Sequence, residues 1–176
     1  DTGRDGTGEI IVSAGGGAVG FATLPKIFKL RNKVAIRDFP WRFVTGPHMP
    51  PEIFNELNAK KTNDTFVERS RPDLPAVISR AKLSISQAGY NTIAELMNAG
   101  TPAVVVPYEG GVETEQRLRS DLLAKRSLLQ VVDENELNVT NLNNAIYQAL
   151  NTKPVKNLNV SLDGASSTAN LLWSLL

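Results

Sequence analysis

Cysteine is absent from the 176 residues of this chain, so disulfide bonds and thiolate metal sites are excluded. An excess of charge is lacking too, because 19 basic and 18 acidic residues leave a net charge of +1. That balance gives no electrostatic basis for binding nucleic acid or an anionic membrane surface. No apolar run approaches the roughly 20 residues needed to span a bilayer, and no signal-peptide pattern opens the chain. The sequence therefore indicates a globular domain with no nucleic-acid partner and no transmembrane segment.

The two ends of the chain differ in composition from the part between them. The first eight residues lack an initiating Met and carry glycine at positions 3, 6 and 8, which is typical of a flexible linker. We interpret residues 1–8 as linker and expect a further domain to precede them. Residues 161–176 are predicted to form a helix. Its apolar end requires a partner surface, either on this domain or on the missing N-terminal domain.

Short apolar runs alternate with segments of helical periodicity through the chain. The runs predict strands at residues 9–13, 41–45, 65–69, 83–86, 103–106 and 128–132. The segments between them predict helices at residues 18–33, where Pro25 could interrupt the helix, 50–59, 74–80, 91–98, 113–125 and 139–150. Several runs are continuously apolar, which favours a parallel sheet covered on both faces. We therefore predict an α/β, doubly wound Rossmann-like sheet of about six strands, with ligands beyond the carboxyl ends of the strands.

A glycine-rich loop follows the first predicted strand. Gly15, Gly16 and Gly17 would let backbone amides approach an anion closely, and the next helix would add its positive end. Residues 15–20 also match the dinucleotide pattern G-x-G-x-x-G. That site needs an acidic residue after the second strand, and residues 45–47 there are Thr-Gly-Pro, so we disfavour NAD. From this loop alone, phosphate contact and a tight packing turn remain equal alternatives.

Residues 86–95 form a second loop that opens a helix. The expected diphosphate-binding groups are the turn glycine and the first helical amides, which belong to Gly89, Tyr90, Asn91 and Thr92. One turn later, the carboxylate of Glu95 could accept hydrogen bonds from two ribose hydroxyls. Thr92-x-x-Glu95 also has the form of a helix capping box. We favour the binding role slightly over that alternative.

A third loop, residues 107–116, also lies between a strand and a helix. Glu115 and Gln116 could bind sugar hydroxyls, although acidic residues here would equally suit the helix dipole. Taken alone, the dipole explanation is favoured. The three loops follow the first, fourth and fifth strands, however, and a doubly wound sheet gathers such loops along one edge.

The pattern S-x-x-G-x-x-T-x-x-E at residues 86–95, Gly-Thr-Pro at 100–102 and Glu-Gln at 115–116 resembles glycosyltransferase family 28. The resemblance covers residues 9 to about 150 and corresponds to the C-terminal, donor-binding half of a two-domain GT-B fold. Residues 9–160 are accordingly expected to bind the donor. One departure concerns Gln87, because the peptidoglycan enzyme of the family commonly has a basic residue at that position. A second is the loop of residues 15–18, which lacks the polar side chain often found after the family's glycine pair.

The resemblance implies an inverting, metal-independent hexosyltransferase that uses a nucleoside diphosphate sugar, with UDP the expected nucleotide, and needs no cofactor. The glycine loop and the helix start would face the diphosphate, and Glu95 the ribose. Arg69 and Ser70 would lie beside the nucleobase and read it mainly with backbone groups. Glu115 and Gln116 would face the donor sugar. Catalytic residues are expected in the missing N-terminal, acceptor-binding domain.

Two alternatives stay open beside this interpretation. A nucleotide-sugar epimerase or hydrolase could use the same fold and donor, and a non-catalytic donor-binding subunit could require a separate partner. For the glycosyltransferase interpretation, the isolated domain is expected to bind a UDP-sugar weakly without transferring the sugar. The full protein is expected in the cytoplasm, with peripheral association at the inner face of the membrane. His48, the sole histidine, is interpreted as a solvent-facing loop residue.

Overall fold

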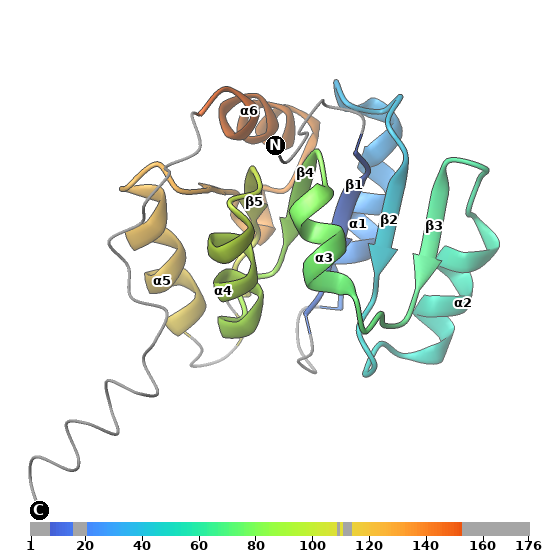
Figure 1. The fold of residues 1–176 in the computed structure, drawn as a ribbon. Helices are drawn as coiled ribbons and strands as arrows, with labels where there is room; N and C mark the ends of the chain where they lie inside the picture. The colour runs from blue at the N-terminus through green and yellow to red at the C-terminus, as the bar shows by residue number, and fades with distance from the viewer. Residues whose placement is uncertain (1–7, 16–20, 109, 111–113, 153–176) are drawn as a thin grey trace, which may run out of the picture.

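The computed structural model describes residues 8–15, 21–108, 110 and 114–152, and these form one layered α/β domain around a single sheet (Figure 1). The strands are β1 (Ile10–Ser13), β2 (Trp41–Val44), β3 (Thr65–Glu68), β4 (Leu83–Ser86), β5 (Ala103–Val105) and β6 (Gln130–Val131). They pair in the order β3-β2-β1-β4-β5-β6, and every pair is parallel. The predicted doubly wound parallel sheet is confirmed.

Helices cover both faces of the sheet. They are α1 (Thr23–Leu30), which runs on into the 3-10 turn η1 (Arg31–Lys33), α2 (Pro51–Ala59), α3 (Leu74–Arg80), α4 (Tyr90–Ala99), α5 (Glu115–Ala124), the 3-10 turn η2 (Glu134–Glu136) and α6 (Val139–Asn151). Helices α1, α2 and α6 pack into one hydrophobic cluster, and α3, α4 and α5 into a second cluster on the opposite face (Figure 1).

The central strands are short and buried from both sides. In β1, Ile10 and Val12 belong to the cluster with α1 and α6, whereas Ile11 belongs to the cluster with α3 and α4. All three side chains have 0% exposure. Since successive side chains of a strand point to opposite faces, a continuous apolar run is what this position in the sheet requires.

Most helix boundaries agree with the predictions within a few residues. Pro25 does not interrupt α1, since it lies in the first turn of the helix, where its missing N–H has no intrahelical acceptor to lose. Helix α4 ends at Gly100, which adopts the left-handed conformation with φ of 58°, a common way for a helix to end. The predicted helix at 161–176 and all of the predicted linker except Gly8 lie outside the described residues.

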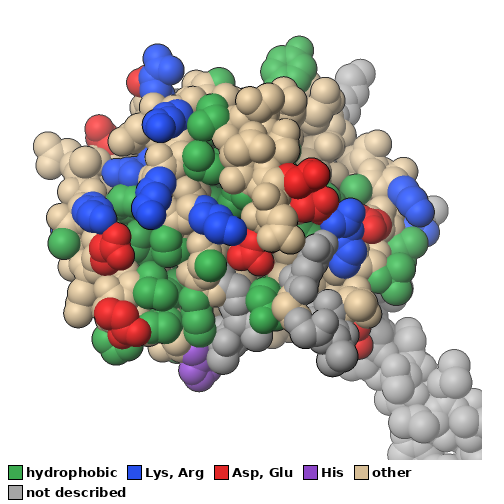
Figure 2. Space-filling model, turned by 180° about the vertical axis from the view of Figure 1, so that it is seen from behind, with side chains coloured by type: hydrophobic (Ala, Val, Ile, Leu, Met, Phe, Trp, Pro, Cys, Tyr) green, Lys and Arg blue, Asp and Glu red, His purple; other side chains and the backbone are tan. Residues whose placement is uncertain are grey.

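The face that carries α1, α2 and α6 has mixed charge. Figure 2 shows basic and acidic side chains interspersed over it, with no large area of one sign. Within the described segments, no helix has the length and apolarity needed to cross a membrane.

Candidate functional site

The sheet has its topological switch point between β1 and β4. From β1 the chain runs to α1 on one face, and from β4 it runs to α4 on the other. The last residues of the two strands, Ser13 and Ser86, are paired in register, and the amide of Gln87 donates to the Ser13 carbonyl at 3.2 Å. Two loops that diverge from adjacent parallel strands leave a crevice where ligands of such folds bind.

Three loops meet at this edge, and glycine allows their close approach. A Cβ at Gly15, which has a φ of 71°, would lie 3.2 Å from the hydroxyl oxygen of Thr92. A Cβ at Gly46, with a φ of 83°, would lie only 2.5 Å from the Gly15 carbonyl oxygen. The loops after β1 and β4 therefore touch, as the sequence predicted. The loop after β2 also takes part through Gly46, which the sequence analysis did not include among the candidate loops. Gly16 and Gly17 lie outside the described residues.

The start of α4 carries backbone donors without acceptors. Gly89 is the N-cap, no side chain caps the helix, and the first intrahelical hydrogen bond runs from the Ile93 amide to the Gly89 carbonyl at 2.9 Å. The amides before it, those of Tyr90, Asn91 and Thr92, donate to no acceptor among the described residues. These are the unpaired helix-start donors that the sequence predicted, and together with the helix dipole they suit an anion.

The capping-box alternative for Thr92 and Glu95 is wrong. A capping box requires the threonine at the N-cap, but Thr92 is the third residue of α4 and Gly89 occupies the N-cap. The threonine hydroxyl therefore cannot serve the helix start in that way.

Thr92 and Glu95 are both polar, sheltered and unpaired. Thr92 is 6% exposed, and its hydroxyl has no hydrogen-bond partner among the described residues. Glu95 is half-buried and likewise makes no hydrogen bond or ion pair within the described part of the chain. Burial raises the pKa of the Glu95 carboxyl. Residues three apart lie on the same side of a helix, so both groups are available to one ligand.

The loop after β5 is held by one of the two predicted sugar-binding residues. Gln116 is buried, and its Oε1 accepts a hydrogen bond from the amide of Tyr108 at 3.2 Å. Glu115 is exposed and lies 3.7 Å from the guanidinium of Arg119. Residues 109 and 111–113 lie outside the described part. The structure thus gives Gln116 a positioning role, and Glu115 remains accessible at the helix start.

Arg119 joins α5 to the loop before α4, a contact that the sequence interpretation missed. Its Nη1 donates to the Ala88 carbonyl at 3.1 Å, and its Cζ lies 5.4 Å from the ring centroid of Tyr90. A basic residue one turn after Glu115 was the available signal. The contact depends on α5 packing beside α4, which spacing along the chain does not reveal.

In the segment predicted to contact the nucleobase, the side chain of Arg69 contacts other residues of the protein. Arg69 stacks over Phe54, with 4.3 Å from Cζ to the ring centroid, and donates to the Met49 carbonyl at 3.0 Å. Ser70 is exposed. A base beside this segment would meet its backbone and Ser70 rather than the guanidinium. His48 is exposed, as predicted.

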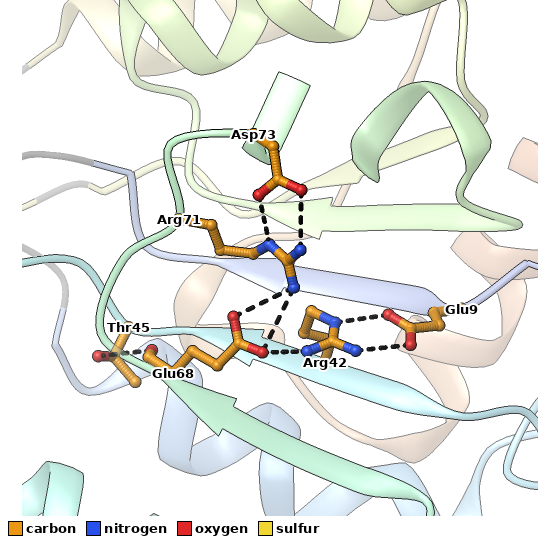
Figure 3. Close-up of polar contacts among 6 residues, drawn as sticks. All are labelled: Glu9, Arg42, Thr45, Glu68, Arg71 and Asp73. Carbon is orange, nitrogen blue, oxygen red and sulfur yellow. Dashed lines mark hydrogen bonds and ion pairs between the residues drawn. The ribbon is translucent and has the colours of Figure 1, made fainter. Parts of the chain in front are cut away.

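A ladder of charged side chains crosses β2 and β3 (Figure 3). We use the name charged ladder for Glu9, Arg42, Glu68, Arg71 and Asp73. Arg42 binds both carboxylate oxygens of Glu9, at 2.6 and 2.7 Å, and also pairs with Glu68. Arg71 binds Asp73 through two hydrogen bonds of 2.9 Å and reaches Glu68 at 3.3 Å. The hydrogen bond with Glu9 is the main cause of the raised pKa of Arg42. These charges neutralise one another, so the ladder offers no free cation to a phosphate.

The family model for the glycosyltransferase family 28 C-terminal domain matches residues 15–171. The chain belongs to this family. Among its curated relatives, the N-acetylglucosamine transferase that acts on N-acetylmuramyl-(pentapeptide) pyrophosphoryl-undecaprenol in Natranaerobius thermophilus is 37% identical over 64% of the chain, and that of Anaplasma marginale is 32% identical over 77%. These matches cover 32% and 39% of the two relatives, so the chain spans about a third of their length.

Solved structures show the same fold in other glycosyltransferases. MurG of Acinetobacter baumannii superimposes with a TM-score of 0.65 at 18% identity, over 95% of this chain and 52% of that one. VinC, solved in complex with DTDP, gives a TM-score of 0.61 at 16% identity, over 82% of this chain and 33% of its own. The family 28 domain therefore has the α/β architecture of GT-B glycosyltransferases.

Proposed function

We propose that this family 28 domain is the donor-binding half of a glycosyltransferase and holds a nucleoside diphosphate sugar at the carboxyl edge of β1 and β4. The observation that carries the proposal is the unpaired start of α4, where three amides, the Thr92 hydroxyl and the Glu95 carboxylate lie together without partners among the described residues. A bound nucleotide would complete the hydrogen bonds of these groups, and hydrogen bonds to charged groups are the stronger ones.

Each part of the donor has a place along this edge. The diphosphate meets the amides of residues 90–92 and the loop at Gly15, and the ribose hydroxyls meet Glu95. The nucleobase lies beside the backbone of residues 68–71, and the sugar faces Glu115 and Gln116. UDP is the expected nucleotide because the curated relatives are UDP-N-acetylglucosamine transferases by name.

The transfer proposed for the full protein inverts the anomeric centre and needs no metal ion. The acceptor oxygen bonds to the anomeric carbon of the sugar as the bond between that carbon and the distal phosphate oxygen breaks. Negative charge therefore grows on the leaving nucleoside diphosphate. The amides at the start of α4 would stabilise that charge, which is electrostatic catalysis. An N-terminal domain would bind the acceptor and supply the general base. The full protein would act at the cytoplasmic face of the membrane.

Calorimetry of the chain with UDP, TDP and UDP-N-acetylglucosamine, in the presence of EDTA, tests donor binding. We expect saturable binding of UDP and its sugar, with TDP weaker, and no release of UDP from the sugar nucleotide. Release of UDP without an acceptor would favour the hydrolase alternative. Absence of binding at millimolar UDP would contradict the proposal.

Glu95→Ala tests the ribose contact in the same assay. Hydrogen bonds to a charged group contribute about 1.5–3 kcal/mol, so the affinity for UDP should fall roughly 10- to 100-fold. Glu52→Ala is the matched control, because Glu52 is an exposed carboxylate in the first turn of α2. If the wild type binds UDP and Glu95→Ala binds it with the same affinity, Glu95 does not contact the nucleotide.

A further inference from the structure

The loop between β4 and α4 offers hydrogen-bond donors to a diphosphate but no formal charge of its own. Gln87, Ala88 and Gly89 are neutral, and a helix start contributes only about half a positive charge. A terminal phosphate alone carries about −1.5 to −2 at neutral pH. Charge-assisted contacts are about twice as strong as neutral ones, so a cation beside these amides would strengthen the site considerably.

Arg119 brings a cation to this loop from the neighbouring helix. Its guanidinium donates to the Ala88 carbonyl at 3.1 Å, one residue before the N-cap of α4. It also faces the ring of Tyr90, the first residue of that helix, at 5.4 Å. The side chain of Arg119 is 26% exposed, so part of it remains open to a ligand. Guanidinium groups carry five N–H donors, which leaves several for an anion.

The other arginines around this edge are committed elsewhere. Arg69 stacks on Phe54, and Arg71 belongs to the charged ladder. Arg117, on the same helix as Arg119, pairs with Asp121 at 3.0 Å and with Asp133. Among the described residues, the carboxylate that pairs with Arg119 is that of Glu115 at 3.7 Å, whose side chain is 83% exposed. Such an exposed pair is worth little, so a phosphate can compete for the guanidinium.

We infer that Arg119 pairs with the distal phosphate of the bound nucleotide, supplying from α5 the charge that the β4–α4 loop lacks. This inference rests on the function proposed above. The distal phosphate is the partner because Arg119 lies between two places, the start of α4 at Ala88 and Tyr90, and Glu115, which faces the donor sugar in that proposal. The phosphate that joins the sugar to the nucleotide belongs between them.

Calorimetry of Arg119→Gln with UDP, UMP and uridine tests the inference. Loss of one charge-assisted pair should weaken UDP binding about tenfold. UMP and uridine should change less than twofold, because they lack the distal phosphate. Arg119→Lys keeps the charge and should bind UDP with intermediate affinity. Arg126→Gln is the control. Arg126 is exposed just after the end of α5, and its guanidinium donates to the Leu122 carbonyl at 3.4 Å.

A purely structural role would give a different result. If Arg119 only held the Ala88 loop in place, UDP, UMP and uridine would all weaken together, and the inference would be overturned. Equal UDP affinities of Arg119→Gln and wild type would overturn it as well, while the proposed function would stand. A wild type that binds no UDP would remove the proposed function itself. Should Arg119→Gln fail to fold, Arg119→Lys decides instead: it must weaken UDP binding while changing UMP and uridine binding less than twofold, and equal weakening of all three ligands would overturn the inference.

Discussion

The charged ladder and the start of α4 differ in whether their polar groups are paired within the protein. In the ladder, Arg42 and Arg71 share three carboxylates through hydrogen bonds, and each charge has a partner (Figure 3). At the start of α4, Thr92 and Glu95 are sheltered from solvent yet have no partner within the described residues. In the ladder the polar groups form their hydrogen bonds within the protein. At the start of α4 the donors and acceptors remain available to a ligand.

The difference shows how binding and structural roles can be told apart without a bound ligand. A charge that is fully paired within the protein contributes to stability and has little left for a substrate. A buried group without a partner carries an energetic cost, and its presence at the switch point of a doubly wound sheet indicates a ligand. Substitutions in the ladder should therefore change stability, and substitutions at α4 should change nucleotide affinity.

The largest expected effect on stability comes from Arg42→Met. The Arg42 side chain is 13% exposed, and its removal leaves Glu9 and Glu68 without their shared cation. We expect the free energy of unfolding in urea to fall by about 2–3 kcal/mol, with UDP affinity nearly unchanged. Arg37→Met is the control, because the Arg37–Asp38 pair is mostly exposed and should contribute less than about 1 kcal/mol. A loss of UDP binding in Arg42→Met with the fold intact would erase the contrast between the two regions.

Thr92 and Thr101 allow a comparison between a hydroxyl without a partner and a hydroxyl with one. Thr101 is buried, and its hydroxyl donates to the Ile78 carbonyl at 2.7 Å, whereas that of Thr92 has no partner in the described chain. Thr101→Val should lower stability by about 1–2 kcal/mol and leave UDP affinity unchanged. Thr92→Val should leave stability intact and weaken UDP binding about fivefold, equivalent to about 1 kcal/mol. The reverse pattern in denaturation and calorimetry would contradict the assignment of Thr92 to the ligand.

The smallest expected effect concerns Glu95 and pH. Burial raises the pKa of its carboxyl in the fold, so the ionised form is disfavoured there, and Glu95 lowers stability at pH values above its pKa in the fold. Glu95→Gln should raise the free energy of unfolding at neutral pH by less than about 1 kcal/mol. The gain should disappear as pH falls below the unfolded-state pKa of about 4.3, where the wild-type carboxyl is protonated in both states.

Glu56→Gln should have the opposite sign. The pKa of Glu56 is lowered, chiefly by its hydrogen bond with Lys60. Its ionised form therefore favours the fold, and this substitution should lower stability slightly at neutral pH. Denaturation of both variants across pH separates the two cases. A stability loss in Glu95→Gln at neutral pH would show that the carboxylate already has a partner.

Much of the fold follows from local patterns in the sequence. Short apolar runs located all six strands, and several of them are continuous because a doubly covered parallel sheet buries both faces of its central strands. Gly100 ends α4 because the left-handed residue after a helix suits glycine. The expectation of unpaired amides at the start of that helix was confirmed for the same reason, since the first N–H groups of any helix lack intrahelical acceptors.

The rest depends on contacts that no local pattern contains. Gly46 approaches Gly15 because β2 lies beside β1, and Arg119 reaches Ala88 because α5 packs beside α4. Arg42 meets Glu68 across neighbouring strands, twenty-six positions apart in the chain. The capping-box alternative failed because the N-cap is decided by the backbone at Gly89, which the spacing of Thr92 and Glu95 cannot reveal.

The central claim is that the free amides at the start of α4 bind a nucleoside diphosphate, and an NMR titration tests it most directly. In ¹H–¹⁵N spectra of the chain titrated with UDP, the amide signals of Tyr90, Asn91 and Thr92 should shift saturably and more strongly than with uridine. The amide of Arg42, a ladder residue outside the nucleobase segment, should stay close to its original position. A UDP titration that leaves the α4 signals unmoved, or that shifts the Arg42 amide instead, would contradict the account.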